Sequence, residues 1–227
     1  MKKLAVLLMV LFAANIFAQE YVVEKLSGKV LVQKGTNENW ETVYPGEKLN
    51  GDALVLTDKD AYVQLNKKGT HFLISANSAL GLNHIKKIST NDLLLALAME
   101  EIRNVPKLKS KGESKSTAVY GSEVSGKNTE VVPENDLGIK KLNGAKILAE
   151  NGYKKSGVIV AKETYRKYPV TKKQIKDRIY FADILYGLGL YQEAAAEYAD
   201  IEQQPMSASE RKIVDKKIEE VNLKLAK

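Results

Sequence analysis

Hydrophobic and polar residues alternate over short runs in the first third of the chain, between residue 21 and about residue 82. Turn-forming residues at Pro45-Gly46, 50–52 and 66–69 separate these runs. Short alternating segments at a spacing of about ten residues are typical of an antiparallel sandwich or roll. The pattern therefore predicts a small all-β unit, with strands at 29–33, 40–43, 53–57, 61–65 and 71–74.

From residue 137 onward the apolar residues recur every three or four positions, which is the helical period. Helix-terminating residues divide this region at Gly152, Pro169, Gly189 and Pro205. The pattern predicts four helices, at 139–150, 154–168, 173–188 and 192–203.

A fifth helix is expected to open at Ser207, because Ser207 and Glu210 have the spacing of a capping box. Its apolar residues fall on one stripe, formed by Val214, Ile218, Val221 and Leu225.

One further helix of about 12 residues is predicted around 93–102, before Pro106. Apolar residues surround most of its circumference, so we expect it to be buried against the β unit. The segment 106–136 that follows has the composition of a solvated linker, and its Lys-rich start could also be a basic ligand-binding tail. The predicted domains are thus a β domain with a following helix at 19–105, this linker, and a helical domain at 137–227.

The first 18 residues have the features of a secretory signal peptide. Lys2 and Lys3 precede an apolar run of eleven residues from Leu4 to Ala14, and Ala18 marks the expected cleavage point. The run is shorter than the roughly 20 residues that span a bilayer. An uncleaved anchor and a buried strand are the alternatives. We expect an exported protein, periplasmic or extracellular, without stable membrane insertion once the signal is removed.

The chain has 227 residues, no cysteine and a formal net charge of +7. The lack of cysteine excludes disulfides, a thiol nucleophile, cysteine-based metal sites and a lipid-modified N-terminal cysteine. Lys and Arg exceed Asp and Glu mainly in one segment, 137–178, where 12 basic residues face 3 acidic ones.

No set of residues has the spacing of a catalytic or metal site. The two histidines, His71 and His84, lack acidic residues at ligand spacing. Phosphate-binding glycine loops and the Gly-x-Ser-x-Gly motif of serine hydrolases do not occur. We therefore expect a non-enzymatic protein with no catalytic residues, no cofactor and no metal.

The β region resembles the FecR-type periplasmic domain over about 60 residues. The counterparts of the family pattern are Gly28, Trp40, Gly46 and Leu49, Gly51-Asp52, Thr57, Gly69 and Asn77. The resemblance implies an all-β envelope module. Regulatory members carry an anti-sigma segment and a membrane helix before this domain, whereas this chain has a signal peptide there. Signal transmission across a membrane is therefore not implied.

The third and fourth C-terminal helices resemble a tetratricopeptide repeat (TPR). The matching residues are Ala182, Gly189, Tyr191, Ala194, Tyr198 and Pro205, and the first two helices repeat Ala145, Gly152 and Pro169 more loosely. Such repeats bind extended peptides or protein loops on the inner face of their first helices. The resemblance places four candidate partner-binding residues in that groove: Lys146, Lys176, Asp183 and Tyr186.

The predicted fold class is α+β, with a small FecR-like β sandwich or roll followed by TPR-like helical hairpins. The predicted function is an envelope scaffold or adaptor for a protein partner, and the alternative is binding of a cell-wall or exported polysaccharide. The basic segment is either a solvated face or a groove for an acidic peptide or anionic polymer. Nucleic acid would fit the charge, but the export signal argues against it.

Overall fold

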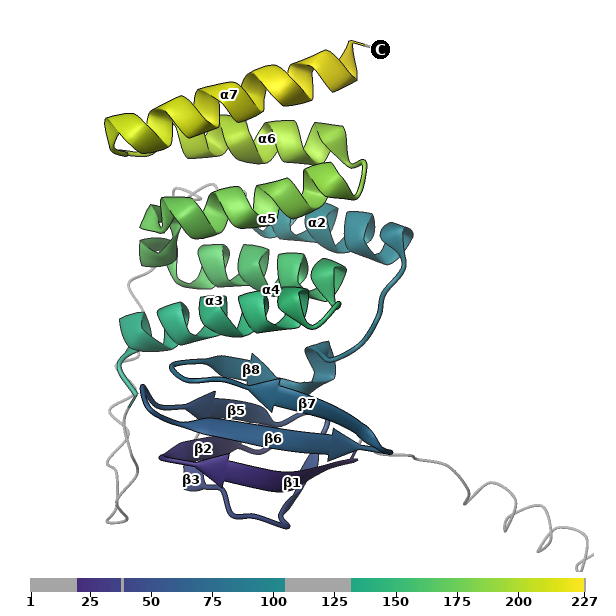
Figure 1. The fold of residues 1–227 in the computed structure, drawn as a ribbon, viewed down its shortest axis with the longest axis vertical. Helices are drawn as coiled ribbons and strands as arrows, with labels where there is room; N and C mark the ends of the chain where they lie inside the picture. Colours follow the sequence, from purple (N-terminus) through teal and green to yellow (C-terminus); the bar gives the residue numbers. More distant parts are fainter. Residues whose placement is uncertain (1–19, 38, 105–131, 227) are drawn as a thin grey trace, which may run out of the picture.

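The computed structural model describes residues 20–37, 39–104 and 132–226. These residues form an α+β fold in which two small antiparallel sheets lie at one end and helices stack on them (Figure 1). The predicted signal peptide at 1–18 lies outside the described residues, as does most of the predicted linker at 106–136.

The described residues contain eight strands in two sheets. The first sheet has the order β4-β1-β6-β7 and consists of β1 (Glu20–Ser27), β4 (Lys48–Asn50), β6 (Tyr62–Lys67) and β7 (Thr70–Ile74). The second sheet has the order β3-β2-β5-β8 and consists of β2 (Val30–Gln33), β3 (Glu41–Thr42), β5 (Leu54–Thr57) and β8 (Ala79–Gly81).

Each of the five predicted runs overlaps one strand, and the predicted turn at 66–69 joins β6 to β7 with Lys67 opposite Thr70. β1, β4 and β8 lie outside the predicted runs. β4 and β8 have only three residues each, too few to show alternation.

The second sheet is covered on both faces. Val55 of β5 lies in the core shared by the two sheets, while its neighbour Leu56 lies in a separate cluster with Leu31 and Ala79. Leu137, at the start of the helical region, packs against that second cluster. Burial on both sides explains why the run 53–57 is almost continuously apolar rather than alternating.

Six α-helices occur in the described part of the chain, together with two short 3-10 turns. They are α2 (Thr90–Asn104), α3 (Glu134–Glu150), α4 (Lys154–Lys167), α5 (Ile175–Gly187), α6 (Tyr191–Glu202) and α7 (Ala208–Leu225), with η1 at Leu82–His84 and η2 at Pro169–Lys173.

All five predicted C-terminal helices are present. α3 begins at Glu134, inside the segment predicted as linker, and α5 begins at Ile175 because η2 occupies the residues after Pro169. The predicted capping box opens α7, where Ser207 accepts from the Glu210 N–H and the Glu210 carboxylate accepts from the Ser207 N–H.

α3–α4 and α5–α6 are two copies of one helical hairpin. Their turns contain Gly152 and Gly189, 37 residues apart, with φ of +85° and +78°. In both turns the residue after the glycine donates its N–H to the carbonyl five positions earlier, at 2.9 and 3.0 Å. This is the Schellman arrangement, and it favours glycine because the backbone is left-handed there. Ala145 and Ala182, also 37 residues apart, are both fully buried.

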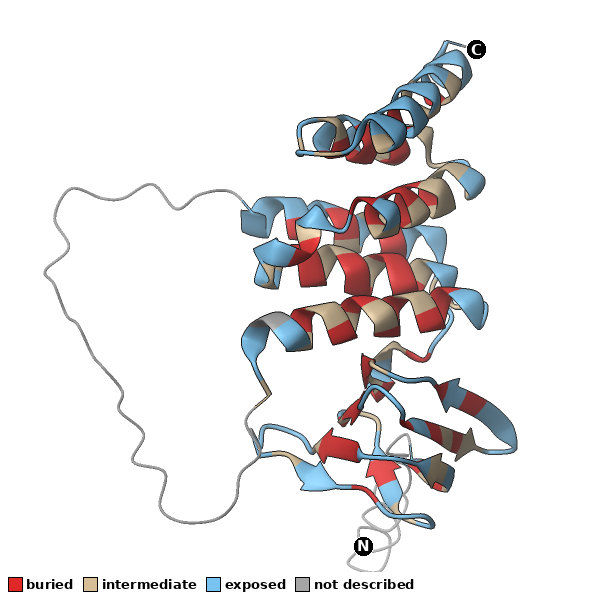
Figure 2. Ribbon diagram, turned by 60° about the vertical axis from the view of Figure 1, so that its left-hand side comes forward, coloured by how far each residue is buried: buried red, intermediate tan, exposed pale blue. Residues whose placement is uncertain are grey.

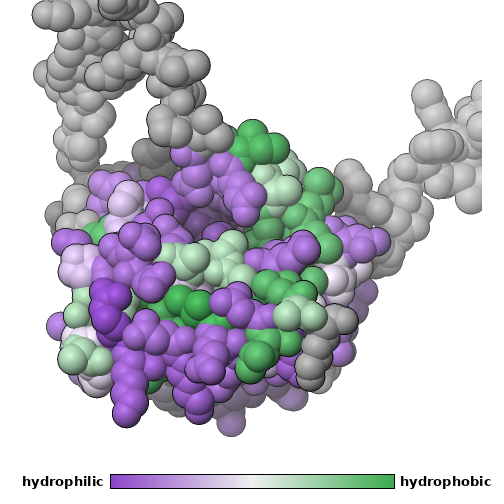
Figure 3. Space-filling view, turned by 90° about the horizontal axis from the view of Figure 1, so that it is seen from above, coloured by the Kyte–Doolittle hydropathy of each residue, from purple (hydrophilic) through white to green (hydrophobic). Residues whose placement is uncertain are grey.

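The helices stack in layers (Figure 2), and one hydrophobic core extends from the sheets through the helices α3 to α7. α7 closes the end farthest from the sheets, where it buries Val214 and Val221 against the array. Figure 3 looks onto this end and shows hydrophobic surface between hydrophilic stretches. The exposed large apolar side chains of α7 are Ile213, Leu223 and Leu225.

The prediction that helix 93–102 packs against the β unit is wrong. α2 lies against α4 of the helical array and buries only Leu93 and Leu97 among its large apolar residues. The same face buries Glu100, whose carboxylate accepts from the Arg166 guanidinium on α4 at 2.5 Å. The buried face of α2 thus combines two leucines with this ion pair, and apolar residues on the opposite face remain exposed.

The sheets and the helical array meet along a seam between α3 and β8. At Gly144 of α3, an added Cβ would come closer than 3.0 Å to the carbonyl oxygen of Ala79 in β8. Glycine is therefore what allows the helix backbone to lie directly on the strand.

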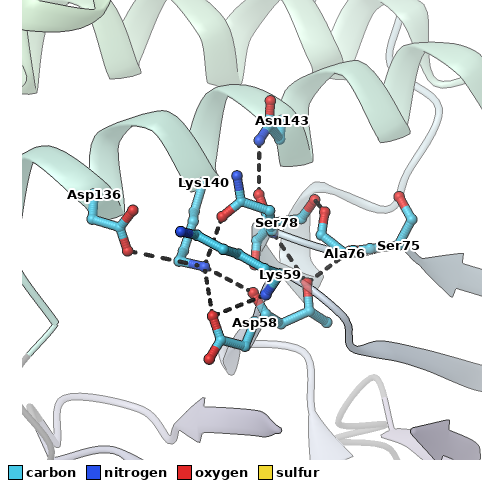
Figure 4. A network of polar contacts seen from close by, with 10 residues as sticks. Asp58, Lys59, Ser75, Ala76, Ser78, Asp136, Lys140 and Asn143 are labelled. Carbon is cyan, nitrogen blue, oxygen red and sulfur yellow. Dashed lines mark hydrogen bonds and ion pairs between the residues drawn. The ribbon is translucent and has the colours of Figure 1, made fainter. Parts of the chain in front are cut away.

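Polar contacts fasten the same seam (Figure 4). The buried Lys140 ammonium of α3 donates to the Thr57 carbonyl at 3.1 Å and to the Asn77 side-chain oxygen at 2.9 Å. The Asn143 side-chain amide donates to the Asn77 carbonyl at 2.7 Å. The Asp58 carboxylate lies 3.7 Å from the Lys140 ammonium and partly balances the positive charge of Lys140.

Candidate functional site

The four predicted groove residues come from the first helix of each hairpin, Lys146 from α3 and the other three from α5. Lys146 of α3 forms an ion pair with Asp177 of α5 at 2.8 Å. Lys176, the neighbour of Asp177, is exposed. Lys146 therefore holds α3 to α5, whereas Lys176 is available to a partner.

The other two predicted residues take part in contacts among α5, α6 and α7. The Asp183 carboxylate accepts from the Tyr198 hydroxyl at 2.5 Å and pairs with the Lys217 ammonium at 2.9 Å. The hydrogen bond that Lys217 donates to Asp183 raises the pKa of Lys217, and burial followed by this same carboxylate raises the pKa of Tyr198. The Tyr186 ring lies edge-on to Tyr191, with centroids 5.2 Å apart.

Ion pairs join successive layers on both sides of the array. On the first helices, Lys146–Asp177 joins α3 to α5 and Asp183–Lys217 joins α5 to α7. On the other side, Glu100–Arg166 joins α2 to α4, and Lys162–Glu197 joins α4 to α6. Lys146 and Asp183 thus serve primarily to hold the predicted groove together, and sequence spacing alone gave no sign of these partners.

A cavity of about 180 Å³ lies at the seam between the second sheet and helices α3 and α4. Its lining includes titratable side chains from well-separated parts of the chain, namely Asp52, His84, Lys141, Glu163, Lys167 and Tyr168. No sequence pattern links these residues, because only the packing of α4 beside η1 brings His84 and Glu163 to one place.

The cavity shifts the protonation of its lining groups. Burial lowers the pKa of His84, and burial together with repulsion from Lys167 lowers the pKa of Lys141. For Glu163, burial alone would raise the pKa, but the ion pair with Lys167 at 2.5 Å outweighs it and holds the pKa below its usual value. Both signs of charge are present, so the cavity suits a small polar molecule.

No described residue forms a hydrogen bond with the His84 ring. The bond between a base and a nucleophile that is typical of catalytic histidines is therefore not seen among these residues. The other histidine, His71, lies on the first sheet and contacts the Glu24 carboxylate at 2.7 Å. Within the described ranges, no three His, Asp or Glu side chains are grouped as a metal site would require.

Comparison of the chain with protein-family models, with curated proteins and with solved structures finds no match in any of the three. Among the helices of the described residues, none combines the length and apolar character needed to cross a membrane.

Proposed function

We propose that this chain is an exported, non-enzymatic protein of the cell envelope that acts as a scaffold or adaptor for a protein partner. In this proposal the sheets are a FecR-like module and the helical hairpins are a short TPR-like array. The motif residues quoted for the two families support the assignment, as does the repetition of the hairpin at an interval of 37 residues.

The observation that carries the proposal is an apolar stripe on the outer face of α2. Leu95, Met99 and Ile102 recur at intervals of four and three residues, so they share one helix face. Their exposed fractions are 63%, 43% and 72%. Adjoining apolar side chains left in water mark protein-interaction surfaces more often than isolated ones do.

The α2 stripe is held outward by the buried contact on the other side of the helix. Glu100 is buried and accepts from Arg166 of α4, so rotating α2 to hide the stripe would separate this carboxylate from the Arg166 guanidinium. A partner helix or groove with an apolar face would remove the stripe from water. Lys176 would favour acidic residues at a second contact.

The test is site-specific photo-crosslinking in the native envelope, with the crosslinking residue placed at Met99, at Lys176 or at the exposed control position Asp60. We expect a discrete protein adduct from position 99 or 176 and none from position 60. Adducts absent from both positions, or equally abundant from all three, would overturn the adaptor proposal. Fractionation of cells that express the full chain tests export, which predicts a shortened product in the envelope fraction.

A further inference from the structure

Three pairs of consecutive lysines, far apart in the chain, meet on one side of the seam. Lys67-Lys68 lies at the β6–β7 hairpin, Lys86-Lys87 follows η1, and Lys154-Lys155 opens α4. All six line two adjoining cavities of about 430 and 220 Å³. The two cavities share Lys86, Lys87 and Tyr153, so they form one continuous depression, which we name the lysine groove.

The lining of the lysine groove contains no Asp or Glu. Among the described residues, no carboxylate lies within ion-pair distance of Lys86, Lys87, Lys154 or Lys155. The nearby Asp92 carboxylate accepts from the Ser89 hydroxyl at 2.7 Å; this bond, followed by the charges of Lys86 and Lys155, lowers the pKa of Asp92. Many other lysines of this chain form ion pairs with acidic residues. The excess of positive charge is therefore specific to this groove.

Bringing these lysines together has an electrostatic cost. Burial, followed by repulsion from Lys68, lowers the pKa of Lys67. The like charges of Lys86, Lys87, Lys154 and Lys155 around one depression destabilise the folded state unless an anion neutralises them.

Aromatic rings form much of the apolar lining of the lysine groove. The Lys67 ammonium lies 4.9 Å from the centre of the Tyr21 ring, which is buried in the sheet core. Phe72 of β7 contacts Tyr153 with ring centroids 5.9 Å apart. Tyr153 is half-buried and lines both cavities, so part of its ring borders the groove where the two meet.

We propose that the lysine groove binds an acidic polysaccharide whose carboxylates pair with the lysines while a sugar ring packs against Tyr153. An amphipathic aromatic ring beside fixed cations matches a sugar that has an apolar face and an anionic edge. A stiff polymer also loses less conformational freedom in a preformed groove than a flexible acidic peptide does. This site goes beyond the adaptor function, because it lies at the seam and uses neither the α2 stripe nor Lys176.

The test uses the processed full chain purified from the envelope and polygalacturonate as the probe, with neutral dextran and poly-glutamate as comparison polymers. We expect binding of polygalacturonate that weakens steeply as salt is added, little binding of dextran, and weaker binding of poly-glutamate. The double variant Lys86→Glu/Lys155→Glu should weaken polygalacturonate binding by at least about tenfold.

Lys172→Glu/Lys173→Glu is the matched control, since it makes the same change of charge in η2, outside the groove lining. We expect its affinity to stay within about twofold of the unaltered chain. An equal loss in both variants would mean that net charge alone attracts the polymer, which overturns the proposal. Binding of poly-glutamate as tight as that of polygalacturonate would also overturn it, in favour of an acidic protein.

Thermal melting checks that the variants are folded, and Lys86→Gln/Lys155→Gln replaces the charge reversal if that variant is not. The substitution Tyr153→Leu keeps apolar volume but removes the flat ring, so it should weaken polygalacturonate binding and leave poly-glutamate binding unchanged. Crosslinking from Met99 should persist in the lysine variants. Loss of polysaccharide binding and loss of the adaptor function are therefore distinguishable.

Discussion

Gly144 of α3 lies directly on the carbonyl of Ala79 in β8, and a Cβ at this glycine would approach that oxygen to less than 3.0 Å. Because the obstacle is backbone rather than a flexible side chain, Gly144→Ala must push the helix away from the sheet. We expect a loss of about 1–3 kcal/mol in the free energy of unfolding, measured by urea denaturation.

Gly187→Ala is the control for this substitution. Gly187 is the last residue of α5, and a Cβ there would meet nothing within 4 Å. Alanine should leave the stability unchanged or raise it by up to about 1 kcal/mol. A Gly144→Ala variant as stable as Gly187→Ala would show that the seam is not closely packed.

Lys140 is the polar counterpart of Gly144 at the same seam. Lys140→Met keeps most of the side-chain volume but leaves the Thr57 carbonyl and the Asn77 side chain without their donor. Unpaired buried acceptors cost about 1–3 kcal/mol in total, so the denaturation midpoint should fall. Lys59→Met, at an exposed position in the facing loop, should leave it unchanged.

The attachment of α2 can be tested at two adjacent glutamates. Glu100 is buried and accepts from Arg166 and Arg103, whereas Glu101 is exposed. Glu100→Ala removes the hydrogen bond between α2 and Arg166 of α4, so it should weaken the α2–α4 contact by about 1–3 kcal/mol. The loss is not larger because both arginines can regain water. Hydrogen exchange of residues 90–104 should accelerate in Glu100→Ala and stay unchanged in Glu101→Ala. Equal protection in the two variants would contradict the role given to Glu100.

Stability should depend on pH through His84. Burial lowers the pKa of His84 in the folded chain below its usual 6.5, so the unfolded chain takes up the proton first. The free energy of unfolding should therefore be constant above about pH 6.5 and fall as the pH drops below it. The charged groups around His84 are Glu163, Lys86, Lys141 and Lys167. Of these, only Glu163 titrates in acid, and its pKa lies below the usual 4.5.

Urea denaturation between pH 7.5 and 5 measures this dependence. His84→Gln should flatten the curve over that range, and His71→Gln should retain its slope because it leaves the surroundings of His84 unchanged. A slope that survives in His84→Gln but disappears in His71→Gln would contradict the role given to His84.

The elements that the sequence predicts well are those stabilised by local interactions. The capping box at Ser207 and the glycines at 152 and 189 stop or start helices through bonds within six residues, so their signals are local. The alternation along β6 likewise survives in the structure, with Val63 and Leu65 buried. Short strands such as β4 escaped prediction because three residues carry no period.

The residues of the candidate sites were harder to predict, because their partners are distant in the chain. Lys146 and Asp183 were expected to face a partner, yet their ion partners Asp177 and Lys217 lie 31 and 34 residues further along. Which carboxylate meets which lysine depends on how the helices stack, and no local pattern contains that information.

The sequence by itself determined the α+β class, the five C-terminal helices and most of the strands, since propensity, capping and periodic burial act over a few neighbouring residues. Tertiary structure alone decided that α2 lies on α4, that Gly144 brings α3 onto β8, and that three lysine pairs share one groove. These depend on contacts between segments tens of residues apart, whose energies exist only once the chain is folded.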